Sequence, residues 1–219
     1  MTGQLALNFP LAEDATFVNY VGDAAQKLRA LSDVCYVWGE AESGRSHLLQ
    51  ACCHMARENN QSAIYLEHPA EHDADILDGL ESVTVVCIDD IDIVLADDKW
   101  QLGLFQLINA VQANRGCLVF SAKPPAKQLP RMLPDLHSRL LAAVAIETDR
   151  LTDVQKLIAL KQRAFRHGFA LNDEVGHFLM GRVPRSMRSL MSLLERIEVE
   201  TLVQQKKVTI PLVKQTLGI

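Results

Sequence analysis

The segment with the clearest chemical signature is glycine-rich and reads Gly39-Glu-Ala-Glu-Ser-Gly44-Arg45-Ser46. It follows an apolar run and precedes a stretch with helical periodicity. Its glycines allow backbone N–H groups to turn inward around an anion, and the N-terminus of the following helix adds its dipole. We therefore predict a nucleotide phosphate site, with contacts from Gly39, Ser43, Gly44, Arg45, Ser46 and His47.

Arg45 stands where such loops usually carry a lysine that reaches between the β- and γ-phosphates. A guanidinium is permanently charged, but it is planar and bulkier than an ammonium group. It can therefore hold phosphate without reproducing the geometry of lysine. We expect a bound nucleoside diphosphate, ADP, with little intrinsic hydrolysis.

Two carboxylates, Asp89 and Asp90, follow the apolar run Val85–Ile88. A strand that leaves the core at Asp89 would place this carboxylate beside the Mg²⁺ of a bound nucleotide, where Ser46 is the other expected ligand. The signal is weak alone, because acidic residues commonly end strands. It is strong in combination, because Asp89 comes about 45 residues after the phosphate loop.

The elements that must position these residues alternate between strand and helix from Val34 to Glu147. Such alternation predicts an α/β fold with a parallel sheet and helices on both faces. The expected strands are Val34–Trp38, Ala63–Leu66, Val83–Ile88, Cys117–Ser121 and Ala143–Ile146, and the expected helices are Ser46–Glu58 and Trp100–Ala113.

After Arg150 the strand patterns stop and only helical patterns follow. Thr152 with Gln155 has the pattern of a capping box, and Asn172 precedes two acids that favour the start of a second helix. Pro184 suits the first turn of a third helix, and a short fourth follows Pro211. We therefore expect an α/β domain over residues 13–150 and a small all-helical domain over residues 151–219, preceded by a peptide of 12 residues.

Composition is that of an ordinary globular protein, 48% hydrophobic and 22% charged. No apolar run approaches the ~18 residues of a membrane span, and no signal peptide pattern is present, so we expect a cytoplasmic protein without a membrane partner. Residues 1–150 carry 11 Lys and Arg against 21 Asp and Glu, whereas residues 151–219 carry 11 against 6. The basic part suits a phosphate-bearing or acidic partner, although ordinary solvated faces explain the difference equally well.

The five cysteines favour core packing over metal binding. Cys52, Cys53 and His54 are consecutive, but adjacent residues on a helix point about 100° apart. No second pair of ligands follows them at the spacing of a zinc site.

The segments Ser46-His-Leu-Leu-Gln-Ala and Ile88-Asp-Asp-Ile resemble the AAA+ nucleotide-binding proteins of the DnaA branch. The resemblance implies that Thr16-Phe-Val-Asn-Tyr20 holds the adenine, through Phe17, Val18 and Tyr20. Mere core packing of these three residues is the alternative. Many AAA+ enzymes carry a glutamate at the position of Asp90, whereas the DnaA branch also has aspartate; the shorter side chain again favours binding over turnover.

Three further positions take roles from the same resemblance. Ser121, ahead of Lys123-Pro-Pro, matches the sensor 1 position, although a serine that ends a strand needs no function. Arg139, within Leu136-His-Ser-Arg139-Leu140, matches the arginine finger, although it could instead cap a helix or pair with Asp135. Arg188 matches sensor 2, although Arg182, Arg185 and Arg196 nearby equally suggest a solvated helix face.

The N-terminal segment Gln4-Leu-Ala-Leu-Asn-Phe9 resembles the short motif that docks into the DNA polymerase III sliding clamp, its β subunit. An extended peptide with an anchoring glutamine and paired apolar side chains suits a hydrophobic pocket. The residues expected to bind are Gln4, Leu5, Leu7 and Phe9. A β-strand or a disordered tail remains the alternative.

Together these resemblances imply a negative regulator of replication initiation, located at the replisome or nucleoid. It would bind the clamp and present Arg139 in trans to the ATP held by the DnaA initiator. Contact with DNA would be mainly indirect through the clamp, because no helix-turn-helix region follows the helical domain, and a homodimer is compatible with AAA+ surfaces. Two other functions stay open: an ATPase motor related to helicase loaders or clamp loaders, and a non-enzymatic adaptor with a degenerate phosphate loop.

Overall fold

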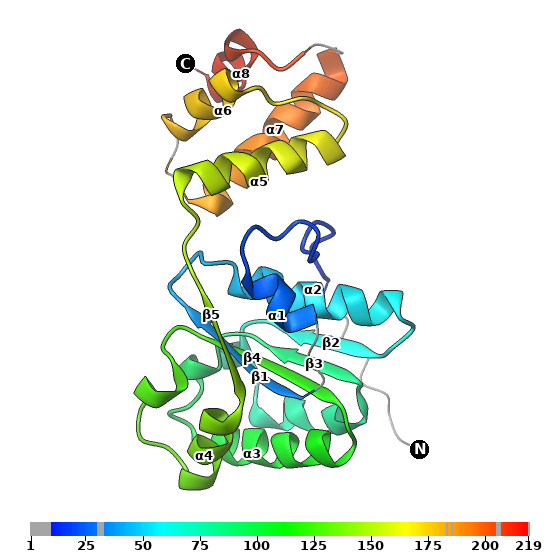
Figure 1. The fold of residues 1–219 in the computed structure, drawn as a ribbon, viewed down its shortest axis with the longest axis vertical. Coiled ribbons are helices and arrows are strands. Elements are labelled where there is room, and N and C mark those ends of the chain that lie inside the picture. The colour runs from blue at the N-terminus through cyan, green and yellow to red at the C-terminus, as the bar shows by residue number, and fades with distance from the viewer. Residues whose placement is uncertain (1–9, 30–32, 183, 185, 205–206, 219) are drawn as a thin grey trace. The chain divides into compact units, whose positions relative to one another are not determined.

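The structure is a computed structural model that describes residues 10–29, 33–182, 184, 186–204 and 207–218 (Figure 1). The residues expected to bind the clamp, Gln4, Leu5, Leu7 and Phe9, lie outside the described residues. The chain divides into two compact units, Met1–Arg150 and Leu151–Ile219.

Five parallel strands form the sheet of the first unit, in the order β2-β3-β4-β1-β5. The predicted parallel sheet is confirmed: β2 has the expected ends, and the ends of the other strands lie within two residues of the expected ones. Val83 lies outside β3, because it ends the short helical turn η3 (Leu80–Ser82). The strands are β1 Val34–Gly39, β2 Ala63–Leu66, β3 Val85–Ile88, β4 Cys117–Ala122 and β5 Val144–Thr148.

Helices cover both faces of this sheet, as predicted (Figure 1). Side chains that alternate along β1 belong to two separate cores. Val34 and Tyr36 pack in the core between the sheet and helices α3 and α4. Cys35 and Val37 pack in the core between the sheet and helices α1 and α2. The helices are α1 Ala24–Arg29, α2 Arg45–Glu58, α3 Asp98–Ala113 and α4 Pro134–Ala142. Short 3-10 turns connect them: η1 Pro69–Glu71, η2 Ala74–Leu77, η4 Ile91–Ile93 and η5 Ala126–Gln128.

The second unit is helical, with α5 Asp153–Arg166, α6 Asp173–Met180, α7 Met187–Gln204 and α8 Ile210–Leu217. The capping box of Thr152 and Gln155 and the N-cap of Asn172 are present as predicted. The expectation that Pro184 lies in the first turn of the third helix is wrong, because α7 begins at Met187. Ser186 starts this helix instead: its Oγ accepts a hydrogen bond from Ser189 N at 3.0 Å.

The cysteines are free thiols, four of them buried and Cys117 half-buried. Within the described residues no group of His, Cys, Asp and Glu side chains is arranged to hold a metal ion by itself. In the described part of the chain, no helix is long and apolar enough to cross a membrane.

Candidate nucleotide-binding site

The phosphate loop joins the end of β1 to the start of α2, and both of its glycines are required by close contacts. A Cβ on Gly39 would lie 2.3 Å from the backbone oxygen and the hydroxyl of Thr148. Gly44, the N-cap of α2, has a φ of 88°, and a Cβ there would lie 2.8 Å from the ring of Tyr20. The loop therefore takes a path that a side chain at either position would block.

Ser43 anchors this loop to β5. Thr148 Oγ1 donates to Trp38 O at 3.1 Å, so the hydroxyl of Ser43 donates to Thr148 Oγ1, at 2.6 Å. The backbone N–H of Ser43 donates to Glu40 O at 3.2 Å. Both donors of Ser43 are thus used within the protein, and its part in the site is to hold the loop in place.

The segment expected to hold adenine packs against the loop and α2. The hydroxyl of Tyr20 donates to Ser43 O at 3.4 Å. The ring centres of Tyr20 and His47 lie 5.6 Å apart. His47 Nε2 is in turn 2.8 Å from Thr16 O. Burial, and then the charge of Asp149, raise the pKa of Tyr20 to about 12, which keeps its hydroxyl protonated. The structure therefore brings Tyr20 and His47 to the phosphate loop.

The other two residues predicted to hold the base lie differently. Phe17 is buried in the core between α1, α2 and the sheet, with the guanidinium of Arg29 5.4 Å from its ring centre. Val18 is 77% exposed. The buried Phe17 thus has a packing role in the structure, whereas Val18 is open to a ligand.

Arg45 and Asp90 form an ion pair across the site, with 2.7 Å between Arg45 Nη1 and Asp90 Oδ1. Asp90 has a φ of 47°, in the left-handed region that few non-glycine residues adopt. Burial raises the pKa of Asp90, the neighbouring Asp89 raises it further, and the charge of Arg45 opposes both effects. The arginine that replaces the usual lysine is therefore engaged with the acid at the end of β3.

Asp89 is a buried carboxylate, 3% exposed, with a hydrogen-bond donor on each oxygen. Tyr65 donates to Oδ2 at 2.8 Å, and the hydroxyl of Ser121 donates to Oδ1. Ser121 Oγ in turn accepts from Asp90 N at 2.8 Å. The structure thus joins Asp89, Asp90 and Ser121, as expected, and adds Tyr65, which was not predicted.

The residues of this site fit a nucleotide with Mg²⁺. The loop leads into the N-terminus of α2, whose backbone N–H groups favour an anion, Arg45 supplies a positive charge, and Ser46 is exposed there. The hydroxyl of Ser46 and the carboxylate of Asp89 are oxygen ligands of the kind that Mg²⁺ prefers.

Arg139 is an exposed residue of α4. Leu136 and Leu140, 0% and 1% exposed, pack this helix into the core. Among the residues that the structure describes, Arg139 is in no salt bridge, so the alternative pairing with Asp135 is not formed. Arg188 is exposed on α7, in the second unit.

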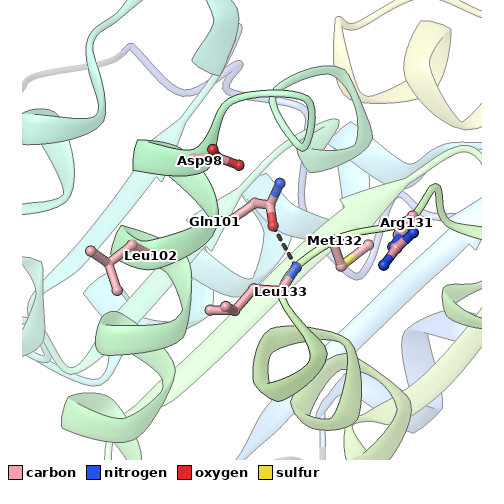
Figure 2. Close-up of a pocket in the computed structure, with 6 residues that line it drawn as sticks. All are labelled: Asp98, Gln101, Leu102, Arg131, Met132 and Leu133. Atoms are coloured by element: carbon pink, nitrogen blue, oxygen red, sulfur yellow. Dashed lines mark hydrogen bonds between the residues drawn. The ribbon is translucent and has the colours of Figure 1, made fainter.

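A pocket of about 490 Å³ lies at the start of α4, away from the phosphate loop (Figure 2). Gln101 of α3, 7% exposed, connects two backbone segments there. Its Nε2 donates to Leu95 O at 2.9 Å, and its Oε1 accepts from Leu133 N at 2.5 Å. The pocket is lined by Asp98, Gln101, Leu102, Arg131, Met132 and Leu133.

Two protein-family models match most of the chain between them. The model described as the bacterial DnaA ATPase domain matches residues 14–147. The model described as the Hda lid domain matches residues 153–217. The first match alone covers more than half of the chain, and it contains the phosphate loop and both acids after β3.

Solved structures with the same fold include replication initiators. Domain III of DnaA from Thermotoga maritima has a TM-score of 0.77 and 18% identity, over 96% of this chain and 98% of that one. AMPPCP-bound DnaA from Aquifex aeolicus has a TM-score of 0.69 and 17% identity, over 87% and 67%. The RuvB Holliday junction branch migration motor from Thermotoga maritima has a TM-score of 0.63 and 18% identity, over 89% and 64%. At these identities the likeness supports the fold alone, an α/β domain with a parallel sheet followed by a helical domain.

Proposed function

Since the chain belongs to the family of the bacterial DnaA ATPase domain and carries an Hda lid domain, we propose that it is a nucleotide-bound regulator that triggers ATP hydrolysis on DnaA. It docks against ATP-bound DnaA and presents Arg139 to the γ-phosphate. The attacking water and the catalytic Mg²⁺ belong to the DnaA site. The product is ADP-bound DnaA, which initiates replication poorly.

The observation that carries this proposal is the placement of Arg139. It is exposed on a helix that the buried side chains of Leu136 and Leu140 fix in the core. A guanidinium on such a rigid support can enter the active site of a neighbouring molecule and stabilise charge on the transferring phosphoryl group. This contribution is worth about 10³–10⁵ in rate in other phosphoryl-transfer systems.

The chain's own site holds ADP rather than turning over ATP. Arg45, Ser46 and Asp89 would hold the phosphates and a Mg²⁺ ion, which neutralises phosphate charge when bound, and Arg188 of the lid would add a contact to the phosphates. The position that activates water in many AAA+ enzymes is occupied here by Asp90, whose carboxylate pairs with Arg45. An acid engaged in this way is poorly placed to accept a proton from water.

The N-terminal peptide tethers the protein to the sliding clamp through Gln4, Leu5, Leu7 and Phe9. Contact with DNA is then mainly indirect, through the clamp, and places the regulator at the replisome. Self-association into a homodimer would use the same AAA+ faces that bind DnaA.

The deciding experiment measures ATP hydrolysis by DnaA with and without this protein and DNA-loaded clamp. The proposal requires a marked increase that needs both additions. Hydrolysis by this protein alone at several turnovers per second would favour the rival ATPase motor. A denatured sample that releases no nucleotide would favour an adaptor with an empty phosphate loop.

A further inference from the structure

Tyr65 is the residue of the nucleotide site that sequence patterns did not predict. It lies near the carboxyl end of β2 and is 3% exposed, as is Asp89. A buried phenol retains one polar atom that needs a partner, and here Asp89 Oδ2 is that partner, at 2.8 Å. The backbone strengthens the connection, because Asp89 N donates to Leu66 O at 2.9 Å.

The hydrogen bonds from both neighbouring strands together define the orientation of the Asp89 carboxylate. Tyr65 reaches Oδ2 from β2, whereas Ser121 reaches Oδ1 from β4, and β3 lies between these two strands. One donor on each oxygen prevents the carboxylate from rotating. An ionised carboxylate has about four acceptor positions, so each oxygen keeps one for Mg²⁺ or for a water bound to it.

We propose that Tyr65 is a positioning residue for Mg²⁺, because its hydroxyl orients the Asp89 carboxylate from the side of β2. The inference rests on the nucleotide-binding part of the proposed function and not on the regulation of DnaA. Hydrogen bonds that orient a metal ligand from behind typically change metal affinity by about 10–100-fold. The increase in ADP affinity that Mg²⁺ provides should therefore depend on the Tyr65 hydroxyl.

The test measures the ADP affinity of the protein by calorimetry, in Mg²⁺ and in EDTA. The quantity compared between variants is the dissociation constant in EDTA divided by the dissociation constant in Mg²⁺. Tyr65→Phe keeps the ring in the core and should reduce this ratio about tenfold. Ser121→Ala, which removes the donor from the other side, should reduce it as well. Asp89→Asn measures the ratio that is left without the carboxylate.

Tyr36→Phe is the matched control. Tyr36 lies in β1, is fully buried, and donates one hydrogen bond, to Pro124 O at 2.9 Å. Loss of this hydrogen bond should lower the thermal unfolding temperature about as much as Tyr65→Phe does. It should leave the ratio of the two ADP dissociation constants unchanged. A merely structural role for Tyr65 predicts that both phenylalanine variants behave alike, which would overturn the inference.

The outcomes separate this inference from the proposal on which it rests. If Asp89→Asn lowers the ratio and Tyr65→Phe does not, Tyr65 has no positioning role, whereas the nucleotide site stands. If the unmodified protein binds no ADP, or binds it equally in Mg²⁺ and EDTA, the proposed site fails and the inference fails with it. A lowered ratio for Tyr65→Phe with an unchanged ratio for Tyr36→Phe supports both.

Discussion

Arg45 lies 2.7 Å from Asp90, so a single ion pair connects the phosphate loop to the end of β3. The arginine side chain is only 12% exposed, whereas that of the aspartate is 41% exposed. A guanidinium in this position must serve two anions, the aspartate and the phosphate that the loop is shaped to hold. This shared charge distinguishes the site from one with the usual lysine, which is a compact charge on a flexible stem.

Arg45→Met should weaken ADP binding and raise the pKa of Asp90 further. Burial and Asp89 raise this pKa, and Arg45 is the group that opposes them, so its removal leaves the charged carboxylate less favourable. Asp90 then has a higher pKa in the folded protein than in the unfolded chain. The free energy of unfolding therefore falls as the pH rises from the ordinary pKa of aspartate through the raised pKa of Asp90. Carboxyl NMR titration checks the pKa, with Arg57→Met, at the exposed end of α2, as the control.

Gly39→Ala should damage the phosphate loop directly. The new Cβ would lie 2.3 Å from Thr148 Oγ1 and 2.8 Å from Ser43 Oγ, so the hydrogen bond that anchors the loop must break or shift. Overpacking of this kind lowers stability by about 1–3 kcal/mol. We expect that loss in chemical denaturation, together with weaker ADP binding. Gly181→Ala, where the nearest contact is 3.5 Å, should change neither quantity appreciably.

Gln101→Met should loosen the start of the helix that carries Arg139. The methionine keeps the volume but leaves the buried Leu95 O and the half-buried Leu133 N without their partner. Figure 2 shows the bond to Leu133. An unsatisfied buried polar group destabilises by about 1–3 kcal/mol, which urea denaturation can measure. Gln106→Met, at an exposed position of the same α3, is the control. Equal stability of the two variants would mean that the Gln101 amide does not hold α4.

Structural features that are determined by residues close together in the sequence could be predicted from the sequence. Strands β1, β2 and β3 are continuous apolar runs, and the capping box of Thr152 and Gln155 spans only four residues. Helix α1 has six residues, too few to establish a helical period, and Pro184 is a weaker start signal than the side chain of Ser186. Tyr65 and Gln101 were missed for another reason: their partners, Asp89 and Leu133, lie 24 and 32 residues away, and within its own segment each reads as ordinary core or helix.

Changing Gln4 and Leu5 together to alanine should abolish binding to the sliding clamp. An anchoring glutamine and a paired apolar side chain would supply most of the affinity of such a short peptide. Surface plasmon resonance on immobilised clamp measures the effect, and an unchanged unfolding temperature shows that the core is intact. The same variant should still bind ADP. Retained clamp affinity would exclude this segment as the tether.

Arg139→Ala should eliminate the stimulation of DnaA without disturbing this protein's own site. The side chain is exposed, whereas the buried Leu136 and Leu140 hold α4 in the core, so its truncation leaves the helix packed. Loss of an arginine finger lowers the rate by about 10³–10⁵, enough to return DnaA to its unstimulated hydrolysis. Arg139→Lys keeps the charge but not the planar fork and should recover only part of the rate. Phosphate release from DnaA, with Arg131→Ala as the exposed-arginine control, measures all three variants. Full stimulation by Arg139→Ala, with its ADP affinity unchanged, would show that the catalytic arginine lies elsewhere.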